Sequence, residues 1–468
     1  MFNKYMLKAS GISQVWLTLT IMLIVFSLVT AGCGNTTQAT GAENPTETAP
    51  PETVHLDSAS KTETVSPAEA APANDDVIKI GVIATLEGPF KVLGEDGVRG
   101  VEMAIAEFGG EIAGKKIEMI KASSNAVDAQ VALAAARKLV EEDNVDIVVG
   151  PLSGDEGLAI KEYAKTQPEK TFVNGTSAAQ DTTLRDPAPN FFRFSTDGVQ
   201  WMAGLGSYAH DVQGHKRIVT VAEDYSFPYS QVGGFLVEFC RVGGTVDTQF
   251  WVPIGTNDYS SVISAIPADI DAIYVALGGS DAVNFLRQYQ RFGGKAPLIA
   301  GSVTLDQTSL GAENVAEYVL GTAAAGPVAD DNPDPAWQQF VADYQKSFPD
   351  GLPSPSLFAH GYYVNAKAAL LALEKINADL SDGQKALQET LSNLEFDSPT
   401  GPIKLDHNRQ AIANNFLTVV DRNEKGNLYN KLVKTIPNVN QTLGIPEDEY
   451  LSIGPLVGGH SGCDQFLQ

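Results

Sequence analysis

Two short loops of small and hydroxyl-bearing residues offer the clearest binding chemistry in this sequence. The run GPLSGD (residues 150–155) follows an apolar run at 145–149 and precedes a helical pattern at 156–165. A second loop, NGTSAA (residues 174–179), follows the apolar residues 171–173. A Gly/Ser turn that opens a helix presents backbone N–H groups at the positive end of the helix dipole, which suits a carboxylate. Turn and N-cap chemistry explains either loop taken alone, but two such loops at one end of a sheet favour a ligand pocket.

The segment from Val77 to Phe108 shows which elements must position such loops. Residues 77–84 form an apolar run rich in Val and Ile, typical of a strand that is buried on both faces. A loop broken by Gly and Pro follows over residues 85–97, and apolar residues three or four apart then predict a helix over 98–108. This unit opens an open parallel α/β sheet, in which ligands bind outside the carboxyl ends of the strands. The loop from Gly88 to Leu93 is therefore expected to form a wall of the site.

The alternation of strand and helix continues along the chain and predicts two similar lobes. Further strands are expected at residues 116–122, 217–222, 245–251, 272–277 and 298–300. Helices are expected at residues 128–142, 200–211, 230–240, 258–266, 280–292, 336–348 and 356–376. The tail beyond Pro437 has little periodicity and receives no placement.

The run GVIATLEGPFKVLGEDGVRGVEMAIAEF (residues 81–108) resembles the start of the type I periplasmic solute-binding proteins of ABC transporters. The likeness is strongest to the branched-chain amino-acid (Leu/Ile/Val) binding group, and segments of similar outline follow in order to about residue 435. The resemblance implies an α/β fold with two doubly wound parallel-sheet lobes joined by three hinge crossings. These crossings are expected near residues 193–198, 322–328 and 412–418. The amino-terminal lobe would comprise residues 77–196 plus 328–412, and the carboxy-terminal lobe residues 197–327 plus 413–468.

The resemblance also implies where a small ligand binds. The family's carboxylate-holding loops fall on Ser153, Gly154, Ser177 and Ala178, with Ala178 standing where Thr is common. An aromatic side chain covers the ligand in the family, and two tyrosines of the loop after residue 222 qualify for that role. The expected substrate-binding set is Leu93, Ser153, Gly154, Ser177, Ala178, Tyr225, Tyr229 and Ser302.

One feature of the family's amino-acid binders is missing from this sequence. In those proteins an acid near the position of Ser302 often receives the ligand ammonium, and this chain has no carboxylate there. Four other acids are open as substitutes: Glu223, Asp224, Asp281 and Asp155.

The first 76 residues predict export and tethering. Residues 1–33 carry Lys4 and Lys8, then an apolar run that ends in small residues directly before Cys33, as in a lipoprotein signal with a lipobox. A single transmembrane anchor is the alternative, and Thr30 stands where lipoboxes usually carry Leu. Residues 34–76 are rich in Thr, Pro and Glu and have a net charge of −7, a composition that predicts a disordered linker.

The net charge and the three cysteines indicate which kinds of partner this protein can have. Residues 77–468 hold a net charge of −20, which gives the protein no electrostatic reason to bind nucleic acid. Cys33 would accept a lipid and attach the protein to the outer face of the cell membrane. Cys240 and Cys463 are either a disulfide or two free thiols, and the sequence leaves this choice open.

Catalytic and cofactor signatures are absent from the sequence. Residues 94–100 read Gly-x-x-Gly-x-x-Gly, which differs from the dinucleotide fingerprint, and no GxSxG, HExxH or Walker motif occurs. The six histidines have no metal-ligand spacing, so no cofactor and no metal are expected. A monomeric, non-enzymatic binding protein that serves ABC transporter permease subunits is favoured. A ligand-sensing module for a membrane receptor and a hydrolase on the same architecture are the alternatives.

Overall fold

The computed structural model describes residues 76–312, 315, 318–459 and 462–467. The predicted signal sequence, the lipid-acceptor Cys33 and nearly all of the predicted linker lie outside these residues. Within the described residues, no helix combines the length and the apolar character needed to cross a membrane.

The first lobe is built on a six-stranded sheet. Its strand order is β2 (Glu111–Ile112), β3 (Lys115–Ser124), β1 (Val77–Thr85), β4 (Ile147–Val149), β5 (Thr171–Val173) and β6 (Phe191–Phe192). All neighbours pair in parallel except β2, which runs antiparallel to β3 at one edge. The carboxyl ends of β1, β4 and β5 therefore meet at one edge, as the sequence predicts for the loops that follow them.

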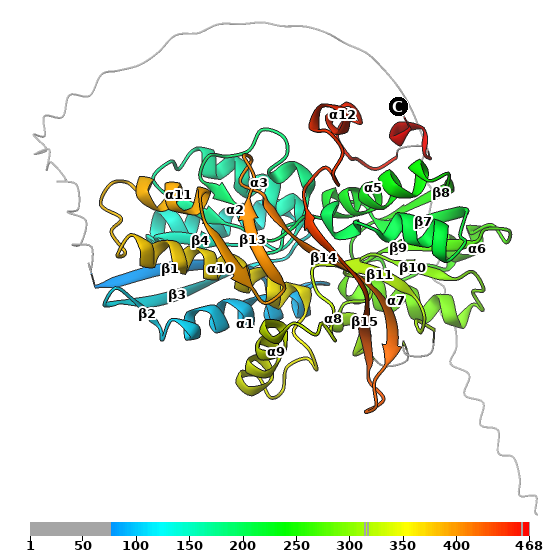
Figure 1. Ribbon diagram of the computed structural model, residues 1–468, viewed down its shortest axis with the longest axis horizontal. Coiled ribbons are helices and arrows are strands. Elements are labelled where there is room, and N and C mark those ends of the chain that lie inside the picture. The colour runs from blue at the N-terminus through cyan, green and yellow to red at the C-terminus, as the bar shows by residue number, and fades with distance from the viewer. Residues whose placement is uncertain (1–75, 313–314, 316–317, 460–461, 468) are drawn as a thin grey trace, which may run out of the picture. The chain divides into compact units, whose positions relative to one another are not determined.

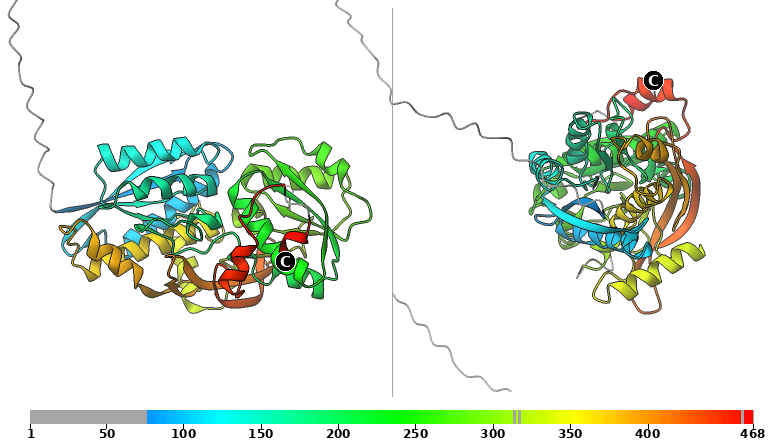
Figure 2. Two further views of the ribbon diagram at one scale, coloured as in Figure 1. Left: turned by 90° about the horizontal axis from the view of Figure 1, so that it is seen from above. Right: turned by 90° about the vertical axis from the view of Figure 1, so that its left-hand side faces the viewer.

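Helices cover both faces of this sheet. One face packs against α1 (Lys91–Glu107), α9 (Pro335–Ser347), α10 (Leu357–Lys375) and α11 (Lys385–Ser392). The other face packs against α2 (Ala129–Arg137), which continues as a π-helical turn (Lys138–Glu142), and α3 (Gly154–Lys165). Figure 2 shows these helices in cyan on the side of the sheet opposite the yellow and gold helices. The sheet is thus covered on both faces, as a buried parallel sheet requires.

Close packing explains the Gly-x-x-Gly-x-x-Gly run of α1. A Cβ atom on Gly94 would lie 1.8 Å from the carbonyl oxygen of Thr85, and one on Gly100 would lie 2.1 Å from that of Ala359. A Cβ on Gly97 would lie 2.6 Å from the ring of Tyr362. The three glycines therefore let α1 approach β1 and α10, two neighbours that Figure 1 shows beside it. This helix starts at Lys91, seven residues before the predicted start, so that part of the expected loop is helical.

A nine-stranded mixed sheet runs through the second lobe, and the two strands at one edge, which carry Phe396 and Ile403, pack on the core of the first lobe. The order is β12 (Glu395–Ser398), β13 (Gly401–Leu405), β14 (Ala411–Arg422), β11 (Ala323–Gly326), β10 (Leu298–Ala300), β9 (Ala272–Ala276), β7 (Arg217–Glu223) and β8 (Thr245–Val252), with β15 (Leu428–Val439) paired to β14. The strands from β11 to β8 are parallel, whereas β12 to β15 pair in antiparallel fashion. The long strands β14 and β15, orange to red in Figure 1, extend the sheet beyond the parallel arrangement that the sequence predicts.

The helices of the second lobe again lie on both faces. The helical elements are α4 (Leu205–Ser207), α5 (Ser226–Arg241), α6 (Ser260–Ala265), α7 (Gly279–Arg291) and α8 (Gln307–Leu310). One core joins α4 and α5 to the sheet and the other joins α6 and α7 to it. The helix predicted at 200–211 is divided into a 3₁₀ turn, the short α4 and a π-helical turn. Gly204 separates the first two of these because it adopts a left-handed conformation.

The chain crosses between the lobes beside a buried arginine. The backbone of Arg193 pairs with the strand that leads into β14, through bonds of 3.0 Å to the Arg409 carbonyl and 2.8 Å from the Ala411 N–H. Its guanidinium is fully buried and donates to the carbonyl of Ala179 (2.7 Å) and to the carboxylate of Asp197 (3.3 Å). The segments at residues 193–197 and 409–411 thus run side by side, and the buried guanidinium of Arg193 has hydrogen-bond partners in this region.

The tail forms a short helix, α12 (Glu447–Ser452), and a disulfide. Cys240 of α5 forms a disulfide with Cys463, with an S–S distance of 2.04 Å. Of the two alternatives that the sequence leaves open, the structure thus has the disulfide and not two free thiols. The phenol of Tyr450 bonds with the side chain of Gln180, and Arg185 donates to the carbonyl of Gly454. Since Gln180 and Arg185 follow β5, the tail contacts both lobes.

Candidate functional site

The carboxyl ends of strands from both lobes surround one small apolar cavity. The lining residues come from the loops after β1, β4, β5, β7, β9 and β10, from the first crossing and from α10: Phe90, Leu93, Leu152, Thr176, Trp201, Tyr225, Phe227, Gly278, Val303 and Phe358. The free volume is about 20 Å³, which is room for a single water molecule. A larger ligand therefore requires the lobes to separate before it enters.

Aromatic rings form most of the cavity wall. The ring of Tyr225 lies 6.3 Å from that of Phe90 and 6.1 Å from that of Phe227, centroid to centroid. Trp201 packs edge-on against Phe227 at 5.5 Å, and its indole N–H donates to the Thr196 hydroxyl at 2.8 Å. The indole is therefore held in place, and its face is available for apolar contact. Such walls suit a flat or branched apolar group.

One buried hydroxyl of lobe one, that of Thr176, belongs to the cavity wall, and two serines, Ser153 and Ser177, lie next to wall residues in sequence. The hydroxyls of Thr176 and Ser177 are buried and have no hydrogen-bond partner among the residues that the structure describes. The Ser153 hydroxyl faces the backbone N–H of Glu156 in the capping box of α3. No Lys, Arg or His belongs to the described lining of the cavity. A ligand that accepts hydrogen bonds would satisfy the hydroxyls of Thr176 and Ser177 without a counter-ion.

The start of α3 is less open to an anion than its sequence predicts. The carboxylate of Glu156 accepts hydrogen bonds from the Ser153 N–H at 3.2 Å and from the Ala126 N–H at 2.9 Å. Burial raises the pKa of Glu156, and these bonds work against that rise. The chain's own acid thus occupies one of the donors that the loop offers. The Ser177 hydroxyl lies against Gly157 of the same helix, where an added Cβ atom would be 1.8 Å from it.

The remaining lobe-one residues of the predicted set lie beside the cavity. Leu93, in the first turn of α1, lines it, and Ala178 is buried in the same apolar cluster. Gly154 lies where the two lobes meet: a Cβ atom there would be 2.5 Å from the Ser226 hydroxyl and 2.8 Å from the Phe227 nitrogen.

The structure separates the two predicted tyrosines. Tyr225 lines the cavity, and burial raises the pKa of its phenol, which stays neutral. Tyr229 lies outside the cavity, because its phenol donates to Asp224 at 2.5 Å and its ring packs edge-on against Trp251. It faces an outer hollow of about 250 Å³ beside the tail.

Ser302 lies behind the cavity wall. Its hydroxyl accepts a hydrogen bond of 2.6 Å from the Gln231 amide, and its side chain lines a separate small space near Asp306. The adjacent Val303 contributes to the cavity instead. The loop after β10 therefore contributes Val303 to the cavity wall, and not the predicted Ser302.

The four acids left open by the sequence differ in how they are satisfied. Asp155 accepts from the Ser226 N–H, Asp224 from the Tyr229 phenol and Asp281 from the Gly255 N–H at 2.6 Å. Glu223 accepts from the Gly278 N–H at 2.9 Å through Oε1, but Oε2 is buried without a partner among the described residues. Burial is the main cause that raises the pKa of Glu223, and Asp281 raises it further.

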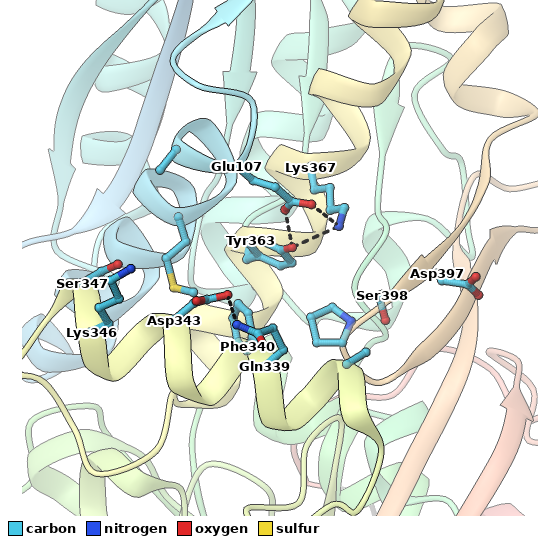
Figure 3. A pocket seen from close by; sticks show the side chains of 14 residues that line it. Glu107, Gln339, Phe340, Asp343, Lys346, Ser347, Tyr363, Lys367, Asp397 and Ser398 are labelled. Atoms are coloured by element: carbon cyan, nitrogen blue, oxygen red, sulfur yellow. Dashed lines mark hydrogen bonds and ion pairs between the residues drawn. The ribbon is translucent and has the colours of Figure 1, made fainter.

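A larger hollow of about 580 Å³ lies on the first lobe, between α1, α9, α10 and β12. Figure 3 shows one bonded group in it: Lys367 pairs with Glu107 at 2.9 Å, and the Tyr363 phenol donates to Glu107 at 2.6 Å. Gln339 donates to Asp343 at 3.0 Å. Because its lining packs on the core of one lobe only, we consider this hollow a weaker candidate than the interlobe cavity.

Sequence reasoning found two of the ten lining residues by number, Leu93 and Tyr225. It missed eight others, although it named the loops that carry several of them: Phe90, Leu152, Thr176, Trp201, Phe227, Gly278, Val303 and Phe358. Trp201 and Phe358 lie in segments predicted as helices, where an aromatic residue indicates core packing equally well.

Comparison with known proteins places this geometry in a class. Residues 77–427 match the family described as periplasmic binding protein. The chain belongs to the periplasmic binding protein family, whose members bind small solutes outside the cytoplasm for ABC transporters. This fold, with lobes of two mostly parallel sheets, is the one that the sequence predicts.

Individual relatives agree with this assignment. The Leu/Ile/Val-binding protein homolog 6 of Brucella melitensis is 25% identical over 375 residues, which cover 78% of this chain and 93% of that protein. A solved ABC transporter substrate-binding protein from Sphaerobacter thermophilus is 28% identical, with a TM-score of 0.71, and the match covers 78% of this chain and 99% of that one. A solute-binding protein from R. palustris, solved with 4-hydroxybenzoate, is 21% identical and has a TM-score of 0.72. The match covers 79% of this chain and 100% of that one. This last likeness shows the fold alone.

Proposed function

We propose that this protein captures a small carboxylate with an apolar, preferably aromatic, body in the interlobe cavity and delivers it to the permease subunits of an ABC importer. The observation that carries the proposal is the cavity itself, because strand ends of both lobes line it and aromatic rings dominate its wall. Sites between two lobes that open and close around a ligand are typical of hinge-bending binding proteins.

The carboxylate is inferred from the unpartnered hydroxyl of Thr176, in the cavity wall, and from that of the adjacent Ser177. Each is a neutral donor that costs free energy while it stays buried without a bond. A hydrogen bond to a charged acceptor contributes about 1.5–3 kcal/mol, so two such bonds can hold a carboxylate without a cation. The net charge of −20 on residues 77–468 makes the hydroxyls, and not long-range attraction, the source of binding energy.

The aromatic body is inferred from the rings of Phe90, Trp201, Tyr225 and Phe227. A Leu/Ile/Val ligand is the alternative that the Brucella relatives suggest, and 4-hydroxybenzoate is the kind that the R. palustris structure suggests. The position near Ser302 has no carboxylate to receive an ammonium group, which favours an aromatic acid over leucine.

Tethering by a lipid on Cys33 is part of the proposal. It rests on the small residues before Cys33 and on the Thr/Pro/Glu-rich segment that separates this cysteine from β1. Replacing Cys33 with Ala should abolish incorporation of labelled fatty acid into the protein. Label that persists in this variant would show that the anchor lies elsewhere.

The experiment that tests the ligand class is a thermal-melting panel on the isolated protein. Benzoate, 4-hydroxybenzoate, leucine and phenylacetamide are added at increasing concentration, and the amide serves as the probe without a carboxylate. A ligand that binds only the folded state adds about 2.7 kcal/mol of stability at 100 times its dissociation constant. We expect stabilisation by an aromatic carboxylate, weaker stabilisation by leucine and none by the amide. Equal stabilisation by the amide, or none by any carboxylate, would contradict the proposal.

A further inference from the structure

The acid at the end of β7 is buried with half of its hydrogen-bonding capacity unused. The side chain of Glu223 is 1% exposed, and Oε1 accepts the Gly278 N–H at 2.9 Å. Oε2 has no partner among the described residues. Buried polar atoms in folded proteins nearly always have a partner, so an exception calls for a physical explanation.

This carboxyl group borders the cavity through a residue without a side chain. Gly278 belongs to the cavity wall, and a Cβ atom built on it would lie 2.9 Å from Val303, 3.5 Å from the Phe90 ring and 3.9 Å from Oε1 of Glu223. Any larger residue at 278 would therefore fill the space between the acid and the apolar wall. The acid belongs to lobe two, at the end of β7.

The protonation of Glu223 suits a hydrogen bond with a neutral group. Burial, and then the neighbouring Asp281, raise its pKa well above the usual range, and the Gly278 N–H only partly offsets this. A protonated carboxyl group both donates and accepts, so it can bond with a hydroxyl or an amino group of a ligand. The other three candidate acids also accept hydrogen bonds, from Ser226, Tyr229 and Gly255, but none of them has a buried oxygen without a partner among the described residues.

We propose that Oε2 of Glu223 binds a hydroxyl or amino group at the end of the ligand opposite its carboxylate, and so selects ring-substituted aromatic acids over unsubstituted ones. The inference rests on the proposed function and deepens it. The ligand would then bridge the lobes, with its carboxylate on the hydroxyls of Thr176 and Ser177 and its distal donor on Glu223. Because the cavity has a free volume of only about 20 Å³ in this structure, the lobes would close on such a ligand at a wider separation, with both of its ends bonded.

The test compares 4-hydroxybenzoate with benzoate, two probes that differ by one hydroxyl. Calorimetry should show that the wild-type protein binds 4-hydroxybenzoate about tenfold tighter, a factor that corresponds to about 1.4 kcal/mol. In Glu223→Met, which keeps the side-chain length and removes both oxygens, the ratio of the two affinities should fall to about one through weaker binding of 4-hydroxybenzoate. Glu238→Gln, a change of a mostly buried acid in α5 that accepts from the Gly204 N–H, should keep the wild-type ratio.

Infrared difference spectra provide a measurement that does not depend on the folding of the Met variant. The C=O stretch of a buried protonated carboxyl group should shift when 4-hydroxybenzoate binds and stay in place when benzoate binds. Glu223→Gln should remove this band and thereby assign it. Absence of the shift overturns the inference even where Glu223→Met does not fold.

The outcomes separate the inference from the function on which it rests. If both probes bind but the Met variant keeps the wild-type ratio, Glu223 does not read the ligand, and the proposed function stands. If no carboxylate of the melting panel binds the wild-type protein, the proposed function fails and the inference fails with it.

Discussion

The backbone N–H of Ser226 in lobe two donates a hydrogen bond to the carboxylate of Asp155 in lobe one, across 3.2 Å. Two more backbone donors make similar bonds between the lobes: Ser280 to the Pro89 carbonyl at 3.4 Å and Leu357 to the Asp306 carboxylate at 2.9 Å. The structure is therefore the closed form. Its contacts identify the positions that must remain small or uncharged for closure.

Gly154→Ala should prevent full closure. Its Cβ atom would lie 2.8 Å from the backbone nitrogen of Phe227, which cannot move away independently of the lobe. We expect the melting temperature without ligand to change by only a few degrees, while the affinity for the best probe of the panel falls at least about tenfold. Small-angle scattering should show that the ligand-induced decrease in radius of gyration is lost. Wild-type affinity in this variant would show that binding does not require the closed contact.

Thr176→Val should weaken a carboxylate probe without harming the fold. The substitution keeps the shape and removes a hydroxyl that is buried without a partner, so the protein without ligand should be equally stable or slightly more stable. Loss of one charge-assisted bond of about 1.5–3 kcal/mol predicts a fall in affinity of about 10- to 150-fold. Thr220→Val in β7, which removes another buried and unpartnered hydroxyl outside the cavity lining, is the matched control. Equal effects of the two variants on affinity would contradict the assignment.

Asp306 should make stability depend on pH below neutrality. Burial raises its pKa to about 7, the hydrogen bonds from Leu357 and Thr308 oppose the rise, and Asp96 adds to it. An aspartate of the unfolded chain ionises near pH 4, so between about pH 4 and pH 7 the folded protein holds a proton that the unfolded chain releases. Its stabilising contribution is thus complete below pH 4 and is lost as the pH rises to about 7.

Asp306→Asn removes this titration. Urea unfolding should show that the stability of the variant improves relative to the wild type as the pH rises from 4 to 7, by up to a few kcal/mol. A stability difference that stays constant over this range would mean that Asp306 does not titrate there. Asp421→Asn is a useful control, because the exposed Asp421 hydrogen-bonds to Lys431 and has a lowered pKa. Its contribution should be lost only as the pH falls below about 4.

Gly100→Ala should destabilise the first lobe. The added Cβ atom would lie 2.1 Å from the carbonyl oxygen of Ala359, so α1 and α10 must move apart. Overpacking of this kind costs about 1–3 kcal/mol, a loss that urea unfolding measures directly. Gly311→Ala, where the nearest atom is at an ordinary 3.5 Å, should cost much less. Similar losses in both variants would show that glycine entropy, and not packing, decides the effect.

The parallel core of the fold was predictable because its strands have a plain signature. The residues of β1, β4, β5 and β9 are short apolar runs bounded by Gly, Pro or polar residues. The strand β15 has no such signature, since its sequence LYNKLVKTIPNV is largely exposed and carries two lysines. Its place depends on pairing with β14, which local sequence does not encode.

The site was predictable only as far as its loops. The alternation of strands and helices predicts that the loops carrying Ser153, Ser177 and Tyr225 lie at the carboxyl ends of their strands. Which side chain of each loop points into the cavity depends on packing. Thus Val303 lines the cavity in place of Ser302, and Tyr229 turns outward to Asp224 and Trp251. The Glu156 carboxylate accepts the Ser153 N–H and so takes one of the backbone donors at the start of α3. The pairing of Ser153 with an acid three residues later is a capping-box pattern, which could have predicted this bond.

The bond between Cys240 and Cys463, which are 223 positions apart, turns the second half of the protein into a covalent ring. A protease that cuts once anywhere between these cysteines opens the ring but releases no fragment. Nicked molecules would keep their full mass on a non-reducing gel and come apart only when the bridge is reduced. A protein exposed outside the cell can thus survive a single cut with its two lobes still joined.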